Sequence, residues 1–152
     1  MEYLGNTELL KVKKTAFLDS SAIPVDMVMK CYDWAAEKHE DCVVSGFSSK
    51  LEHDVLHFLL KEKSNIILVL ARRMYRVIPE ELKEALDRGR LLVISTNDAV
   101  RQSKATALAR NKYICEMADK IIFVGVTPKS SLYPIMESNK SKIIPMNLGE
   151  SE

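Results

Sequence analysis

The sequence predicts a three-layer α/β/α fold, in which helices cover both faces of a mostly parallel sheet of five or six strands. Three observations support this fold class. Five short apolar runs alternate with segments of helical periodicity, which is the pattern of parallel βαβ units. Three of these runs are almost uninterrupted Val, Ile and Leu, as in strands buried on both faces. A length of 152 residues suits one core, so we expect a single domain over residues 1–152.

Each apolar run is short enough for a strand and is bounded by charged or turn-forming residues. A sixth strand over Lys142–Pro145 would lie at an edge of the sheet, because Pro145 has no N–H for the hydrogen-bond ladder. The other expected strands are Thr15–Leu18, Cys42–Ser45, Ile66–Leu70, Leu91–Ser95 and Ile121–Val124.

Apolar residues at helical spacing fill the intervals between the strands. Pro24 suits a first helical turn, Ser48 or Ser49 could cap the second helix, and Gly89 is a typical stop after the third. In this order the elements predict a Rossmann-like fold. The expected helices are Pro24–Lys38, Leu51–Lys61, Pro79–Asp87, a stretch from about Ala99 or Ser103 to Met117, and a short one over Ser131–Glu137.

The composition excludes several classes of protein. No apolar run approaches the roughly 20 residues of a membrane span, and the N-terminus is charged where a signal peptide is apolar. The three cysteines lack the spacing of a zinc site or of a disulfide framework. We therefore expect a cytoplasmic protein without a membrane partner or a metal. The net charge of +1 indicates no partner by itself, so the positions of the charges must be considered.

Ligands of open parallel sheets bind beyond the carboxyl ends of the strands, and here those loops are rich in hydroxyl and basic side chains. The turn Gly46–Lys50 could present backbone N–H groups to an anion, or it could only turn the chain and cap a helix. The loops after the first and last parallel strands allow the same two interpretations. The candidate phosphate-binding residues of these loops are Ser20, Ser21, Gly46, Ser48, Ser49, Lys50, Lys129, Ser130 and Ser131.

Basic residues supply further candidates. Arg72 and Arg73 follow the third strand and could bind phosphate or carboxylate, or belong to a solvated loop. The run from Arg110 through Asn111 to Lys112 lies near the middle of the fourth helix, and by itself reads as an exposed polar face. No Walker A, GxGxxG, GxSxG or HExxH pattern occurs. The sequence therefore identifies no catalytic residue and no cofactor, and it favours a binding protein over an enzyme.

Two of these segments resemble motifs of a known family. Val44–Glu52 reads VSGFSSKLE and resembles the VSGxARGID signature of the DNA-processing protein A (DprA, or Smf) family, and Arg110–Lys112 resembles its Arg-Asn-Arg. Asp19–Ser21 replaces the family's Gly-Ser-Arg turn, and Lys129–Ser131 loosely matches its last turn. The resemblance covers roughly residues 12–147. It implies contact with single-stranded DNA or a nucleotide through Ser20, Ser21, Gly46, Ser49, Lys50, Arg110, Asn111 and Lys112.

Three hypotheses for function follow. The first is a non-enzymatic module that binds single-stranded nucleic acid, and the second is a sensor or hydrolase of a nucleotide-derived small molecule. The wider superfamily includes LOG-type phosphoribohydrolases, but the Pro-Gly-Gly turn and the catalytic Glu of that branch are missing, which disfavours hydrolysis. The third is a scaffold that forms a homodimer.

Overall fold

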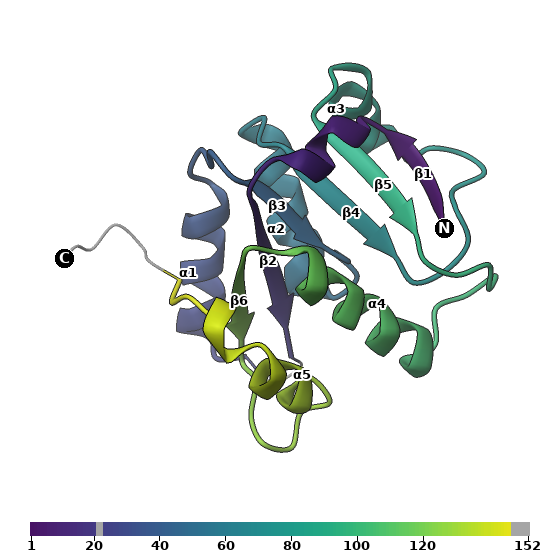
Figure 1. Cartoon of the computed structure of the whole chain (residues 1–152). Coiled ribbons are helices and arrows are strands. Elements are labelled where there is room, and N and C mark those ends of the chain that lie inside the picture. Colours follow the sequence, from purple (N-terminus) through teal and green to yellow (C-terminus); the bar gives the residue numbers. More distant parts are fainter. Residues whose placement is uncertain (21–22, 147–152) are drawn as a thin grey trace.

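The computed structural model describes residues 1–20 and 23–146, and it confirms the predicted α/β/α fold (Figure 1). The described strands are β1 (Glu2–Gly5), β2 (Lys14–Asp19), β3 (Cys42–Ser45), β4 (Ile66–Leu70), β5 (Leu91–Ser95) and β6 (Lys120–Val124). They form one sheet in the order β1-β5-β4-β3-β2-β6. All pairs in this sheet are parallel except β1 with β5.

Helices cover both faces of the sheet (Figure 1). One face packs against α1 (Val25–Ala35), α2 (Lys50–Lys61) and α3 (Lys83–Asp87), and the other packs against α4 (Lys104–Met117) and α5 (Tyr133–Ser138). Short 3-10 turns are formed by residues Thr7–Lys11, Glu80–Leu82 and Lys140–Lys142. None of the helices in residues 1–20 and 23–146 has the length and apolar character needed to cross a bilayer.

Side chains along β2 point alternately to the two faces of the sheet, and each face has its own hydrophobic core. Phe17 points to the face of α1, where its ring stacks on Trp34 with 5.3 Å between the centroids. Its neighbours Ala16 and Leu18 point to the face of α4. Because β3, β4 and β5 are buried on both faces, their sequences are nearly continuous apolar runs, and those runs are the signal that predicts them.

The predicted strand Lys142–Pro145 is wrong. Residues Lys140–Lys142 form a 3-10 turn, and only a single bridge joins Ile143 to Ile121 of β6. The sixth strand is instead β1, which pairs antiparallel with β5 at the opposite edge. Three of its four residues are exposed, so β1 lacks the apolar pattern of the other strands.

Gly5 ends β1 in the left-handed region, at φ +106°. A Cβ at this position would overlap the backbone carbonyl of Leu91, to which β1 approaches closely. Only glycine permits both the conformation and the approach. The pairing of β1 with β5 therefore depends on a glycine at position 5 more than on buried side chains.

The helices lie close to their expected ranges, with differences at their ends. Pro24 precedes α1 instead of lying inside its first turn, and the helix ends at Ala35 rather than at Lys38. The expected helix Pro79–Asp87 begins as a 3-10 turn and stops before Gly89, which has φ +75°. Ser103 caps α4, as one of the two expected starts requires.

Candidate functional site: a crevice at the carboxyl ends of the strands

An open crevice of about 660 Å³ lies at the carboxyl end of β2. The strand β2 has β3 on one side and β6 on the other, so the order of the strands reverses at this point. In open α/β sheets, ligands bind beyond the strands at such a switch point. The loops after β2 and β6 and the start of α2 line the crevice, together with one side chain from α4. The topology therefore places the crevice where the sequence predicts binding.

The structure brings part of the predicted site together here. Ser21 falls outside the described residues. The predicted residues that line the crevice are Ser20, Ser49, Lys50, Asn111, Lys129, Ser130 and Ser131.

Other predicted residues lie elsewhere. Gly46, Ser48, Arg72 and Arg110 line a smaller pocket of about 220 Å³, on the β4 side of the turn that follows β3. The backbone N–H of Arg73 donates to the carbonyl of Ala99 at 2.8 Å. Lys112 lies apart from both hollows, in a groove that α4 forms with α5. The sequence thus predicted as one site what the fold divides among several surfaces.

The turn between β3 and α2 is organised by Glu52. Ser49 caps α2 by accepting a hydrogen bond from the N–H of Glu52 at 3.0 Å, and the Glu52 side chain completes a capping box. The Glu52 carboxylate also accepts the N–H of Ser48 at 3.0 Å and that of Ser49 at 3.4 Å. The anion held by these N–H groups is therefore the chain's own carboxylate, which agrees with the capping interpretation of Ser49.

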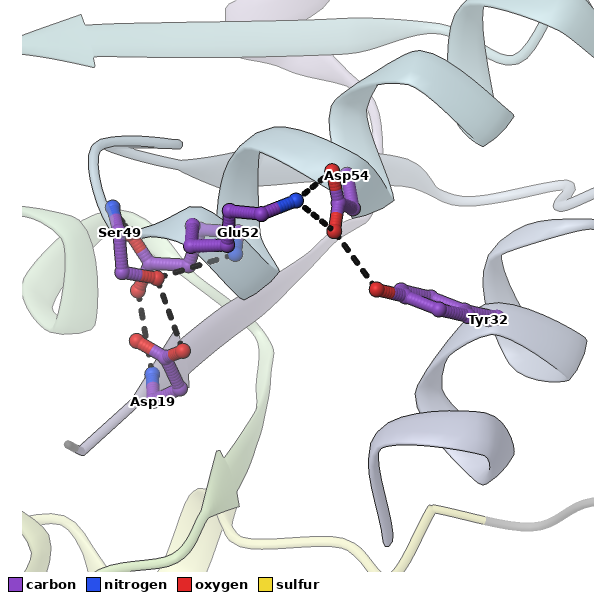
Figure 2. Close-up of polar contacts among 6 residues, drawn as sticks. Asp19, Tyr32, Ser49, Glu52 and Asp54 are labelled. Carbon is purple, nitrogen blue, oxygen red and sulfur yellow. Dashed lines mark hydrogen bonds and ion pairs between the residues drawn. The ribbon is translucent and has the colours of Figure 1, made fainter. Parts of the chain in front are cut away.

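A second carboxyl group lies beside Glu52. Asp19 ends β2, its N–H donates to Glu52 at 3.1 Å, and its Oδ2 accepts the hydroxyl of Ser49 at 2.8 Å (Figure 2). Burial, followed by the charge and hydrogen bond of Glu52, raises the pKa of Asp19 to about 8. The crevice therefore has a neutral carboxyl at its floor near pH 7.

Lys50 stands on the rim of the crevice with its side chain 90% exposed. Its ammonium lies 3.1 Å from the carboxylate of Asp54, which also accepts the hydroxyl of Tyr32 at 2.6 Å (Figure 2). The hydrogen bond from Tyr32 is the main cause that lowers the pKa of Asp54. This chain of contacts joins α1 to α2 and leaves the Lys50 ammonium open to solvent.

Hydroxyl groups join β2 to the loop after β6. Ser20 donates a hydrogen bond to the Oγ of Ser130 at 2.9 Å, and that oxygen also accepts the N–H of Thr127 at 2.9 Å. Lys129 lies exposed in the same loop. The loop therefore presents a cation beside hydroxyl groups that are already ordered.

Arg110 is buried, and the interpretation of its segment as an exposed face is wrong at this residue. The side chain is 3% exposed, and Nη1 donates to the carbonyl of Val69 at 3.1 Å. Nε donates to Asn111 at 2.8 Å, and Nη2 lies 3.4 Å from the hydroxyl of Ser48. Burial lowers the pKa of the guanidinium, while the charge of Glu52 acts in the opposite direction. Arg110 connects α4 to the ends of β3 and β4.

Gly46 is needed because Arg110 is there. A Cβ at Gly46 would overlap the guanidinium of Arg110. The left-handed residue of this turn is instead Phe47, at φ +48°, which is unusual for a residue with a large side chain. The tight turn expected of Gly46 is therefore formed at the next residue.

Arg72 packs over the ring of Tyr75 in the smaller pocket, with its Cζ 5.1 Å from the ring centroid. This stacking holds the arginine against the protein.

Within residues 1–20 and 23–146, no group of three or more His, Cys, Asp or Glu side chains is placed to hold a metal ion.

No family model and no curated protein matches the sequence. The structure is similar to that of DNA-processing protein A (DprA) from Streptococcus pneumoniae, with a TM-score of 0.74 and 21% sequence identity over 94% of this chain. The chain has the DprA fold. The resemblance found in the sequence is thereby confirmed for the fold.

A second DprA structure supports the same conclusion. The Helicobacter pylori protein, whose structure is described for its single-stranded DNA binding mode, matches with a TM-score of 0.69 and 19% identity. That match covers 99% of this chain and 74% of the H. pylori chain. This chain spans about half of the pneumococcal DprA, of which 53% is covered.

Sequence reasoning did not select Asp19, which lines the crevice, or Glu52, which lies beneath it against Asp19 and Ser49. Glu52 was visible as the last residue of the VSGFSSKLE segment, where an acid three residues after Ser49 is the signal of a capping box. Asp19 gave no such signal, because its partner is distant in the chain.

Proposed function

We propose that this chain binds single-stranded nucleic acid, with the backbone phosphates lying along the crevice at the end of β2. The observation that carries the proposal is the crevice itself. It lies at the switch point of a DprA fold and combines two exposed lysines with ordered hydroxyl groups. The H. pylori DprA, described for its mode of binding single-stranded DNA, supports the same class of ligand here.

Lys50 and Lys129 are the cations best placed to contact phosphates, because both are exposed and both line the crevice. Ser131, also exposed there, and the half-buried Asn111 can add hydrogen bonds. Arg110 supports the site indirectly, since its guanidinium is buried against β3 and β4.

The first experiment is a fluorescence-anisotropy titration of a labelled oligothymidine at several salt concentrations. We expect Lys50→Ala/Lys129→Ala to weaken binding by about tenfold or more. If each lysine neutralises one phosphate, the slope of log affinity against log salt falls by roughly 1.4. The matched control is Lys104→Ala/Lys140→Ala, which removes the same charge from α4 and from the 3-10 turn Lys140–Lys142, both outside the crevice.

Two results would contradict the proposal. One is an affinity of the wild type that does not change with salt, because phosphate contacts release counterions. The other is an equal loss of binding in the crevice variant and in the control, which would indicate only a general effect of charge.

A single nucleotide is the second candidate ligand, and the volume of the crevice favours it. Small-molecule sites commonly enclose about 300–1,000 Å³, and this crevice has about 660 Å³. A thermal-shift panel of mononucleotides, followed by calorimetry, tests this candidate. If a nucleotide binds, we expect a rise in Tm and saturation at one ligand per chain.

The homodimer expected from the sequence stays a prediction. Sedimentation velocity of the same samples tests it.

A further inference from the structure

Asp19 lines the crevice, and the buried carboxyl group of Glu52 lies beside it. Glu52 is 6% exposed, and its carboxylate accepts three backbone N–H groups, those of Asp19, Ser48 and Ser49. Bonds of this kind stabilise the ionised form of a carboxyl group. The Asp19 carboxyl, in contrast, accepts the single hydroxyl of Ser49.

Neither carboxyl forms an ion pair. Among residues 1–20 and 23–146, the lysines, arginines and histidines that form ion pairs do so with other acids. Lys50, the nearest basic residue in sequence, pairs with Asp54. Asp19 has no ion-pair partner among these residues, and burial together with the neighbouring Glu52 raises its pKa to about 8, so this carboxyl keeps its proton near neutral pH. The geometry differs between the two side chains, because Glu52 accepts three backbone N–H groups while Asp19 accepts the hydroxyl of Ser49.

We propose that Asp19 is a specificity-determining residue of the crevice, and that its proton decides whether a phosphate can bind there. A protonated Asp19 presents no charge to a phosphate that enters beside Ser20 and Ser49. An ionised Asp19 adds a second negative charge to that of Glu52 and repels the phosphate. This inference rests on the proposed function, because it concerns the same crevice and the same class of ligand.

Asp19 is the group expected to titrate just above neutral pH, because the pKa values of the neighbouring Cys31 and Tyr32 are raised further above that range. Burial raises the pKa of Cys31 to about 11, so this thiol stays neutral in that range. The hydrogen bond to Asp54 likewise raises the pKa of Tyr32. The titratable and charged groups that face Asp19 and Glu52 from the surrounding elements are Cys31 and Tyr32 of α1, Lys50 of α2, Arg110 of α4 and Lys129 of the loop after β6.

The test is the oligothymidine titration repeated from pH 6 to pH 9 at constant ionic strength. With a pKa of about 8, about a tenth of the chains keep the Asp19 proton at pH 9, so we expect wild-type affinity to fall about tenfold. Asp19→Asn keeps a neutral group of the same size. It should bind like the wild type at pH 6 and lose little affinity at pH 9.

A control variant separates this effect from other titrations. Asp54→Asn removes the carboxylate that contacts Lys50 and Tyr32 and leaves Asp19 in place, so it should keep the tenfold loss. A wild type whose affinity does not change with pH would overturn the inference while leaving nucleic-acid binding intact. The same loss in Asp19→Asn as in the wild type would also overturn it.

A measurement without ligand keeps the two proposals distinguishable. Carbon-13 NMR of the aspartate carboxyls should show one group that titrates near pH 8 and is missing from the Asp19→Asn spectrum. If that signal is present but no oligothymidine binds at pH 6, the proposed function is wrong, and so is the proposed control of phosphate binding by Asp19. If every aspartate titrates near pH 4, Asp19 does not keep its proton near neutral pH and the inference is wrong even if DNA binds.

Discussion

Asp19 holds its proton in the folded chain at pH values where an unfolded aspartate has lost it. Burial and Glu52 raise the pKa from 3.8 to about 8. Between these values the folded state binds more protons than the unfolded state, so the free energy of unfolding falls as the pH rises through this window.

Asp19→Asn should remove this pH-dependent loss of stability. We expect the variant to gain about 1 to 2 kcal/mol over the wild type at pH 8, less than the full shift implies because part of the carboxyl is screened by solvent. Near pH 4 the gain should be close to zero. Urea unfolding at the two pH values measures the difference, and an equal effect at both would contradict a raised pKa.

Gly46→Ala should disrupt the packing of Arg110. The new methyl group would displace the guanidinium from its place beside the carbonyl of Val69, and a buried charge without its hydrogen bonds is costly. We expect a loss of about 2 to 4 kcal/mol in urea unfolding. Gly89→Ala is the matched control, because a Cβ there would meet only the Asn6 side chain at an ordinary 3.7 Å, although φ is +75°, and it should lose only about 1 kcal/mol. A loss in Gly46→Ala no larger than that of the control would mean that the new methyl group does not displace Arg110.

At the scale of residues, sequence reasoning found the hydroxyl groups and lysines of the crevice but not its carboxyl pair. Ser49 and Lys50 follow directly after a recognisable strand and turn. Asp19 and Glu52 are brought together by the pairing of β2 with β3, and nothing local in the sequence shows that contact. Arg110 was misjudged for the same reason, because the glycine that admits it follows another element, the strand β3.

At the scale of elements, the start of α2 ties helix capping to the chemistry of the crevice. Ser49→Ala removes both the cap of α2 and the hydroxyl that Asp19 accepts, and we expect it to cost about 1 kcal/mol. Because that hydroxyl lowers the pKa of Asp19, the variant should also shift the Asp19 titration to higher pH. Ser103→Ala, which uncaps α4, should cost a similar amount and leave the titration unchanged. Urea unfolding and carbon-13 NMR give the two readouts.

The strands β3, β4 and β5 could be predicted because burial on both faces requires nearly continuous apolar runs, and β2 and β6 because each contains a shorter apolar run. The edge strand β1 could not, since its pairing depends on backbone contacts with β5 and its side chains are largely exposed. The segment Lys142–Pro145 was wrongly predicted as a strand because it contains two isoleucines. Its backbone forms only one bridge to β6, between Ile143 and Ile121, and no ladder.

At the scale of the whole molecule, the topology determines where the crevice lies, and side-chain packing determines which residues line it and which line the smaller pocket. The switch point beside β2 follows from the order of the strands, and the crevice lies at this point, where the general rule for such sheets places ligand sites. Ser48 and Arg110, whose side chains meet at 3.4 Å, line the smaller pocket and not the crevice. That detail requires three-dimensional packing, which no pattern of residues along the chain specifies.

The position of β2 also bears on how the chain is made. This strand lies inside the sheet, yet one of its two neighbours is β6, which is synthesised last among the strands. Until β6 leaves the ribosome, a nascent chain exposes the free edge of β2, a run that contains Phe17 and Leu18. Unpaired apolar edges of this kind promote association between chains, so chaperone protection should matter most in this interval. The crevice, which needs the loop after β6, comes into existence only when that interval closes.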